Sequence, residues 1–234
     1  MSRATIGQQS RTMAAELDKG AVERAYARWA PVYDLVFDKL LEKGRRTAVD
    51  AAMRAGSRIL DVGVGTGLEL PYFHASTQVV GVDLSEPMLR KAKERVRKMD
   101  LRCVTGLGVM DAARLAIADD SFDAVVAPYV ITTVPHPEAT LDEFVRVVRP
   151  GGEIVLVNHI SAETGTRAAL EKWLTRQTRQ LGWRPEFPWE RIENWRLARP
   201  DLELMERRPV PPFGMFSLVR LRKAHAAEAP LAAE

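Results

Sequence analysis

The segment Ile59-Leu-Asp-Val-Gly-Val-Gly-Thr-Gly restricts the possible folds of this chain more than any other, because three glycines alternate directly after a short apolar run. The run Arg58–Val62 has the composition of a buried strand. Glycine accepts positive φ and lets a ligand approach the backbone closely, so Gly63, Gly65 and Gly67 indicate a tight turn beside a bound molecule. For the glycines alone, an ordinary turn between a strand and a helix is the alternative interpretation.

Two acidic residues narrow the choice of ligand for this turn. Asp83 ends the next apolar run, twenty residues after Gly63, where a carboxylate can accept hydrogen bonds from both hydroxyls of a ribose. The glycine spacing is G-x-G-x-G, whereas dinucleotide sites have G-x-G-x-x-G. Asp61 precedes the turn, and its charge repels a pyrophosphate but attracts a cation. A cationic nucleoside such as S-adenosylmethionine (SAM), with its sulfonium and α-ammonium groups, therefore fits better than NAD.

Apolar runs and helical patterns alternate along the chain, which is typical of a parallel sheet covered by helices on both faces. An amphipathic helix is expected from Gly20, with an end or a kink before Pro31. A proline-rich link without a helix joins the last two runs, so these should form an antiparallel edge. The expected strands are 58–62, 78–83, 101–105, 122–127, 153–158, 202–206 and 214–222, and the later helices are a short one from about Leu68, then 86–99, 138–148 and 165–181.

Composition excludes several classes of protein. With 234 residues, 46% of them hydrophobic and 28% charged, the chain can bury a full core, which excludes a disordered chain or a coiled coil. Cys103 is the only cysteine, so no intramolecular disulfide can form. The four histidines are scattered, and we expect no metal site. No apolar run reaches the roughly 20 residues that span a bilayer, and the start lacks the apolar core of a signal peptide, so we expect a cytoplasmic protein.

Four segments resemble, in the same order, the motifs of class I SAM-dependent methyltransferases: Asp61-Val-Gly-Val-Gly-Thr-Gly, Val82-Asp83-Leu-Ser, Asp111-Ala and Arg149-Pro-Gly-Gly. The resemblance implies an α/β fold with a Rossmann-like sheet of seven strands in the order 3-2-1-4-5-7-6, helices on both faces and an added N-terminal helix. It also implies SAM as methyl donor and S-adenosylhomocysteine (SAH) as product. The donor-binding residues that it implies are Asp61, Gly63, Gly65, Gly67, Asp83, Leu84, Met88, Asp111, Ala112 and Tyr33.

Segments outside these motifs bear on the methyl acceptor. The stretch from Tyr26 to Asp34 resembles both lipid-quinone methyltransferases and bacterial phosphatidylethanolamine N-methyltransferases, whereas Tyr129-Val-Ile-Thr-Thr-Val-Pro-His-Pro, Leu156-Val-Asn-His159 and 181–189 resemble the latter more. This resemblance implies methylation of phosphatidylethanolamine, and of its mono- and dimethyl products toward phosphatidylcholine. The alternatives are a quinone or other small-molecule methyltransferase, and a SAM-binding protein without turnover. Ala127-Pro-Tyr129-Val lacks the Asn/Asp-Pro-Pro-Tyr pattern of methyltransferases that act on bases, so no nucleic-acid partner is expected.

A protonated lipid amine must lose a proton before it can attack a methyl group, so the site needs a proton acceptor. His159, just past an expected strand, is the first candidate, and Tyr26 and Tyr129 are the others. Arg184 is the candidate cation for the lipid phosphate. Aromatic rings stabilise a quaternary amine through cation–π attraction, and those expected near the site are Tyr26, Trp29, Tyr33 and Tyr129.

Tryptophans and cations are clustered in two regions, as at a surface that contacts the headgroups of an anionic membrane. The first helix carries Trp29 and then Lys39, Lys43, Arg45 and Arg46; the second region carries Trp173, Trp183, Trp189 and Trp195 among arginines such as Arg191, Arg196 and Arg199. Core tryptophans and solvated arginines are the alternative. We expect residues 1–48 to form a tail and an amphipathic lid or membrane helix, 49–224 the methyltransferase domain and 225–234 a frayed tail, with the protein bound peripherally at the inner face of the membrane.

Overall fold

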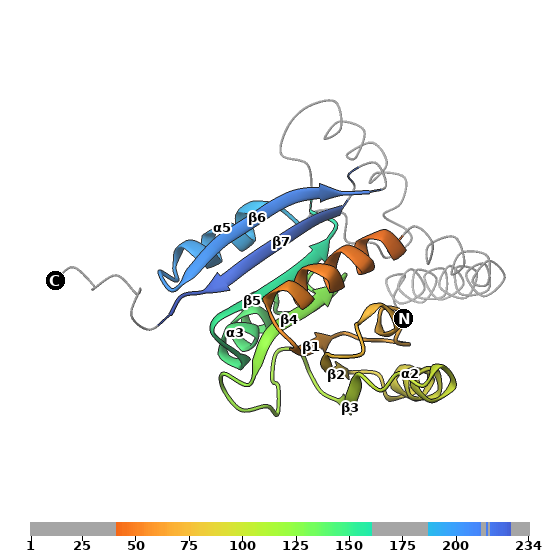
Figure 1. The fold of residues 1–234 in the computed structure, drawn as a ribbon. Helices are drawn as coiled ribbons and strands as arrows, with labels where there is room; N and C mark the ends of the chain where they lie inside the picture. The colour runs from red at the N-terminus through yellow and green to blue at the C-terminus, as the bar shows by residue number, and fades with distance from the viewer. Residues whose placement is uncertain (1–40, 161–186, 212–213, 215, 226–234) are drawn as a thin grey trace, which may run out of the picture. The chain divides into compact units, whose positions relative to one another are not determined.

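Seven strands form one sheet in the order β3-β2-β1-β4-β5-β7-β6 in the computed structural model, which describes residues 41–160, 187–211, 214 and 216–225 (Figure 1). This order confirms the predicted topology. The chain divides into two compact units, Met1–Glu42 and Lys43–Glu234, and the whole sheet belongs to the second. A helix covers residues 41–55, and the domain boundary expected between residues 48 and 49 falls inside it.

Five parallel strands make up the first part of the sheet, and their pairing brings their carboxyl ends to one edge. In a parallel α/β sheet this edge is where ligands bind, at the point where the strand order reverses. The reversal occurs between β1 and β4, which pair through Leu60 and Val125. The bounds of these strands are β1 Arg58–Val62, β2 Gln78–Asp83, β3 Val104–Val109, β4 Phe122–Pro128 and β5 Val148–Asn158.

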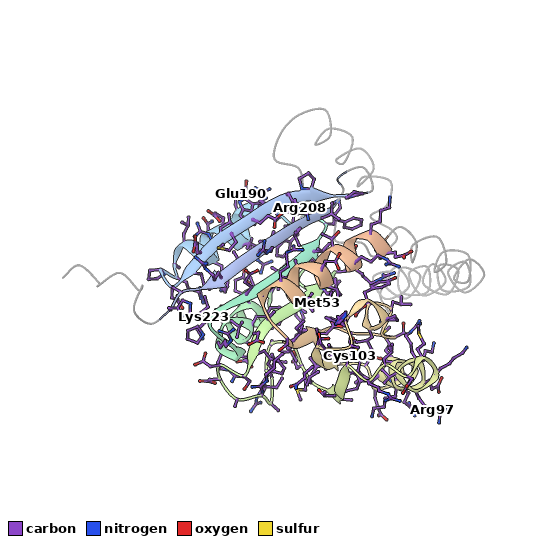
Figure 2. All side chains as sticks on the ribbon, viewed as in Figure 1. Met53, Arg97, Cys103, Glu190, Arg208 and Lys223 are labelled. Atoms are coloured by element: carbon purple, nitrogen blue, oxygen red, sulfur yellow. The ribbon has the colours of Figure 1, made fainter. Side chains whose placement is uncertain are left out.

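The last two strands, β6 (Leu202–Val210) and β7 (Phe216–Lys223), pair antiparallel with each other, as predicted, and β7 pairs antiparallel with β5. Arg220 on β7 holds the three strands together, because its guanidinium donates to Glu153 of β5 at 2.9 Å and to Glu206 of β6 at 3.0 Å. Lys223, labelled in Figure 2, lies at the far end of β7. Its ammonium donates to Asp120 and to two backbone carbonyls.

Helices cover both faces of the sheet (Figure 1). Leu156 of β5 joins the main apolar cluster with Phe144 of α3 and Trp195 of α5, whereas the next residue, Val157, faces Gly44 of the helix over residues 41–55. Neighbouring strand residues point to opposite faces, so α3 and α5 lie on one face and the helix 41–55 on the other. The remaining bounds are η1 Leu70–Tyr72, α2 Glu86–Met99, α3 Pro137–Val147 and α5 Trp189–Leu197.

Three strand starts differ from the prediction, and that of β7 lies two residues late, at Phe216. β3 begins three residues late, because Asp100 ends α2 in the left-handed region (φ 49°) and the Leu101 amide still bonds to Val96, which keeps this stretch in the helix cap. β5 begins five residues early, at Val148, where it pairs with Phe122 before an irregularity in the register. The helix α5 was not predicted, and the helix expected over 165–181 lies outside the described residues.

Candidate functional site

The glycine turn after β1 adopts the backbone that its sequence predicts, with φ of 73° at Gly63, 52° at Gly65 and 74° at Gly67. A Cβ at Gly63 would overlap the side chain of Val130, so that position must be glycine for packing as well as for φ. Around Gly65, a Cβ would meet nothing closer than the Met88 sulfur at 3.8 Å. The turn is therefore packed against Val130 at Gly63 and open around Gly65, as a loop that receives a ligand requires.

Asp83, at the end of β2, holds the turn in place. Its Oδ2 accepts a hydrogen bond from the Gly65 amide at 2.8 Å, and its Oδ1 accepts one from the Ser85 amide at 2.7 Å. Beside it, Leu84 is 72% exposed and Met88 is 47% exposed. Large apolar side chains exposed at the mouth of a turn are suited to cover a flat, apolar ligand group such as an adenine.

Asp111 follows β3 and lies near Asp83, since Val109 pairs with Asp83 and the Met110 amide donates to the Asp83 carbonyl at 3.1 Å. The Asp111 carboxylate is exposed and accepts from the Ala113 amide at 2.9 Å, and Ala112 beside it is half-buried. The donor-binding residues predicted in the described part of the chain thus lie along the carboxyl ends of β1, β2 and β3.

Asp61 is fully buried, and it points away from the α3 face because its neighbours Leu60 and Val62 belong to the apolar cluster there. No N–H or O–H donor in the described part of the chain bonds to either of its carboxyl oxygens. They face Glu69, which is 4% exposed. Burial and the Glu69 carboxyl raise the pKa of Asp61 well above its ordinary value, and burial raises the pKa of Glu69 to about 7.

The buried Asp61 carboxyl at the base of an open glycine turn accepts from no donor among the described residues, and a cation would satisfy it. SAM offers an α-ammonium and a sulfonium, so the residues present fit this donor. A dinucleotide offers only phosphates to the turn, and the carboxyls would repel them. Sequence reasoning had named Asp61 but not Glu69. The available signal was a Glu two residues after the last glycine, between apolar Leu68 and Leu70, in a segment too apolar for a surface loop.

Tyr129 and His159, two candidate proton acceptors, are brought together by Phe216. The ring of Phe216 lies edge-on to that of Tyr129 at 5.1 Å between centroids and to that of His159 at 6.3 Å. Tyr129 has φ of 65°, which is uncommon for a bulky residue, and its amide donates to the Val157 carbonyl at 2.6 Å. The buried Phe216 (2% exposed) was not identified from the sequence, because it is separated from both partners by more than fifty residues.

The phenol of Tyr129 is a poor proton acceptor. Burial raises its pKa above the ordinary value, with a further contribution from Glu69, so at neutral pH it keeps its proton. A Cβ at Gly44 would overlap its hydroxyl, which shows how closely the helix 41–55 approaches. Among the described candidates, this leaves the half-buried His159 to accept a proton.

Arg45 does not face outward as expected for a membrane contact. Its side chain is 5% exposed, and its charge acts on both Glu69 and Tyr129. Of the other predicted cations on this helix, Lys43 is exposed, and the guanidinium of Arg46 lies over the ring of Tyr72 at 4.1 Å. The predicted residues Tyr26, Trp29, Tyr33, Lys39 and Arg184 lie outside the described residues.

The described part of the tryptophan–arginine region is core and ion pairs rather than a membrane surface. Trp189 and Trp195 are 8% and 5% exposed in the apolar cluster, and the Trp195 indole donates to Asp142 at 2.9 Å. Carboxylates pair with the neighbouring arginines: Arg191 with Glu138, Arg196 with Glu193 and Arg199 with Asp142. The expectation of exposed tryptophans is therefore wrong for these two, since α5 buries them against α3. In the helices described, none has the length and apolarity needed to cross a bilayer.

Comparison with known proteins agrees with this geometry. A family model described as a methyltransferase domain matches residues 60–156. A phosphatidylethanolamine N-methyltransferase from Cereibacter sphaeroides is 43% identical over 208 residues, which is 89% of this chain and 99% of that protein. A demethylmenaquinone methyltransferase from Renibacterium salmoninarum is 36% identical over 162 residues, 67% of this chain and 62% of that protein.

Solved structures agree on the fold. The YcgJ protein from Bacillus subtilis superposes with a TM-score of 0.62 over 76% of this chain and 97% of its own, at 17% sequence identity. At that identity the likeness concerns the arrangement of the sheet and helices and not the reaction.

Proposed function

The chain belongs to the SAM-dependent methyltransferase family, and from that membership we propose that it transfers methyl groups from SAM to the amine of phosphatidylethanolamine. The observation that carries the proposal is the 43% identity along 99% of a phosphatidylethanolamine N-methyltransferase. Identity over nearly the whole length includes the segments outside the sheet core, and substrate choice in a shared fold depends on such segments.

SAM, when bound, supplies a methyl group on a positively charged sulfur. When the amine attacks this methyl group, the bond to sulfur breaks and SAH leaves. The turn at Gly63, Gly65 and Gly67 would receive this donor, and Asp83 would bind its ribose. Asp61 would lie next to its positive charge. These residues would hold the donor at the carboxyl edge of the sheet, and positioning supplies most of the rate of such a displacement.

His159 is the residue that we assign to the proton. It follows β5 at the carboxyl edge, beside Phe216 and close to Tyr129. A neutral imidazole has a pKa suited to accept the proton of an ammonium that has been moved out of water. The neutral phenol of Tyr129 would then hydrogen-bond to the amine or the lipid, while its ring and that of Phe216 offer π faces to the methylated cation.

The proposal extends to repeated methylation, which this arrangement supports. The first and second products are ammonium ions that still carry an N–H proton, and removal of that proton by His159 would make each a nucleophilic amine again. The third product is quaternary and carries no proton, so the sequence of reactions ends at phosphatidylcholine. The aromatic environment tolerates this growth, because attraction between a ring face and a cation does not require an N–H group.

A lipid acceptor places the enzyme at a membrane surface, and we extend the proposal to peripheral binding at the inner face, favoured by anionic lipid. The exposed Lys43 supports it, and the part of the chain that precedes residue 41 holds the remaining candidates, Trp29 and Lys39. Each exposed cation near an anionic leaflet contributes about 1 kcal/mol to binding. Arg45 has no part in this contact because it is buried.

A competition between acceptors tests the proposal. Vesicles that contain both phosphatidylethanolamine and a demethylmenaquinone are incubated with the protein and methyl-labelled SAM, and the two lipid classes are separated. We expect label in the phospholipid, and a His159→Asn variant should lose most of it while still binding SAM; His136→Asn, at the start of α3, is the matched control and should keep activity. Label in the quinone alone would refute the proposal.

The second candidate function, methylation of a quinone, is favoured by the 36% identity to a demethylmenaquinone methyltransferase. That relative is matched over 62% of its length, so the likeness omits more than a third of it. The same competition experiment decides between the two acceptors.

A further inference from the structure

Asp61 and Glu69 form a buried pair of carboxyls that the binding of ribose and adenine does not use. Asp61 is fully buried at the end of β1, and Glu69 is 4% exposed at the cap of η1. The two side chains are close enough to share a hydrogen bond when one of them is protonated. No other donor in the described residues bonds to the Asp61 oxygens. Without a ligand, the pair must hold a proton, because two adjacent buried charges of one sign are too costly.

The charged groups around the pair are arranged unevenly. Arg45, from the helix 41–55, and Arg95, from α2, act on Glu69, whereas Asp83, from the end of β2, acts on Asp61. Tyr129, at the end of β4, also lies within the field of Glu69 but stays neutral. Glu69 thus has cations on one side and a carboxyl on the other, which favours ionisation of Glu69 before that of Asp61.

We propose that Glu69 is a second carboxylate ligand for the α-ammonium group of the methyl donor, beside Asp61, and that the pair releases its proton when this ammonium binds. The inference rests on SAM as the donor and goes beyond the proposed function, because it assigns a residue and a proton to the binding step. An ammonium has three donors, and two carboxylates at the base of the open turn can accept from two of them. The cation replaces the proton, so the pair becomes fully ionised.

This arrangement makes donor affinity depend on pH. The protons lost on binding belong to groups whose pKa is raised in the free protein, that of Glu69 to about 7 and that of Asp61 well above its ordinary value. Affinity for a ligand that carries the ammonium should therefore rise by at least tenfold, to order of magnitude, between about pH 5.5 and 7. A ligand without the ammonium should show no such rise.

Two probes isolate the ammonium. SAH keeps the α-ammonium but has no sulfonium, and 5′-methylthioadenosine keeps the adenosine and the thioether but has no amino-acid group. Calorimetric titration of the full chain with each probe, at pH 6 in buffers of different ionisation enthalpy, counts the protons exchanged. We expect release of at least about one proton with SAH and none with 5′-methylthioadenosine.

A variant gives the second readout. Glu69→Gln should weaken SAH binding about tenfold, which is roughly 1.4 kcal/mol, and should leave 5′-methylthioadenosine within about twofold of the original protein. Glu94→Gln, on the exposed side of α2, is the matched control and should bind both probes unchanged. The proton count on the unmodified protein needs no variant, so it decides the matter even if Glu69→Gln folds poorly.

The outcomes separate the two proposals. No proton release with SAH, or an equal loss of both probes in a folded Glu69→Gln protein, would overturn the role of Glu69 while leaving the methyltransferase intact. Failure of the unmodified protein to bind SAM or SAH at any pH would overturn the donor assignment together with this inference.

Discussion

The buried carboxyl pair makes the stability of the ligand-free protein fall as pH rises, and Glu69→Gln should reduce this fall. Glu69 has an ordinary pKa of 4.5 in the unfolded chain and a pKa raised to about 7 in the folded one, mainly by burial. Between these values the folded state keeps a proton that the unfolded state loses. The free energy of unfolding contributed by this group is therefore highest below pH 4.5 and decreases toward pH 7.

The size of the effect follows from the shift. A pKa raised from 4.5 to about 7 corresponds to roughly 3 kcal/mol of lost stability at high pH, of which roughly 2 kcal/mol falls between pH 5 and 7. Glutamine at this position keeps the shape but cannot ionise, and it also removes the neighbour that raises the pKa of Asp61. The variant should thus lose at least this part of the pH dependence.

Urea unfolding at pH 5 and pH 7, without any donor, measures the difference directly. The unfolding free energy should decrease from pH 5 to pH 7, and this decrease should be about 2 kcal/mol smaller in Glu69→Gln than in the original protein. Glu94→Gln, an exposed residue of α2, should behave as the original does. Parallel pH profiles for the original protein and Glu69→Gln would refute the reasoning, because they would mean that Glu69 ionises in the folded state as it does in water.

Two further substitutions test the packing around the acceptor side. Gly44→Ala improves helix propensity by about 1 kcal/mol, yet its Cβ would overlap the Tyr129 hydroxyl. We therefore expect a net loss of about 1–2 kcal/mol in unfolding free energy and reduced methyl transfer. The control Gly106→Ala, where the nearest atoms are 3.9 Å from the new Cβ, should keep its activity. Phe216→Ala should lower the unfolding free energy by about 3–5 kcal/mol. It should also lower the activity of the folded fraction, because both Tyr129 and His159 pack on this ring. The control Phe144→Ala, in the core with α3, should lose similar stability without lowering activity per folded molecule. Thermal or urea unfolding together with methyl transfer per folded protein checks both pairs, and equal activity losses in Phe216→Ala and Phe144→Ala would contradict a special role for Phe216.

Local sequence predicted those parts of the fold that local physics determines. The strand Arg58–Val62 and the helix Glu86–Met99 were predicted with the bounds that the structure shows, because continuous apolar runs and a 3.6-residue period are strong signals. The positive φ of the glycine turn followed from its three glycines. The starts of β3 and β5 were misplaced, since a helix cap and an irregular strand pairing decide them and neither leaves a clear pattern in the sequence.

Burial was harder to predict than secondary structure. Arg45 and Trp195 carry the residue types of a membrane surface, but whether such a side chain faces lipid, solvent or the core depends on which helices pack around it. Trp195 is buried by α3, and Arg45 turns toward Glu69. Phe216 was missed because its partners Tyr129 and His159 are distant in the sequence. Glu69 was missed because its apolar neighbours indicate burial, but only the folded turn brings it to Asp61.

A time course of methyl label from SAM into phosphatidylethanolamine vesicles, with and without an anionic lipid, shows whether the acceptor is the amine of phosphatidylethanolamine. We expect label first in the monomethyl lipid, then in the dimethyl lipid and finally in phosphatidylcholine, at a higher rate when anionic lipid is present. Absence of label from all three lipids, by a protein that binds SAM normally, would contradict this expectation.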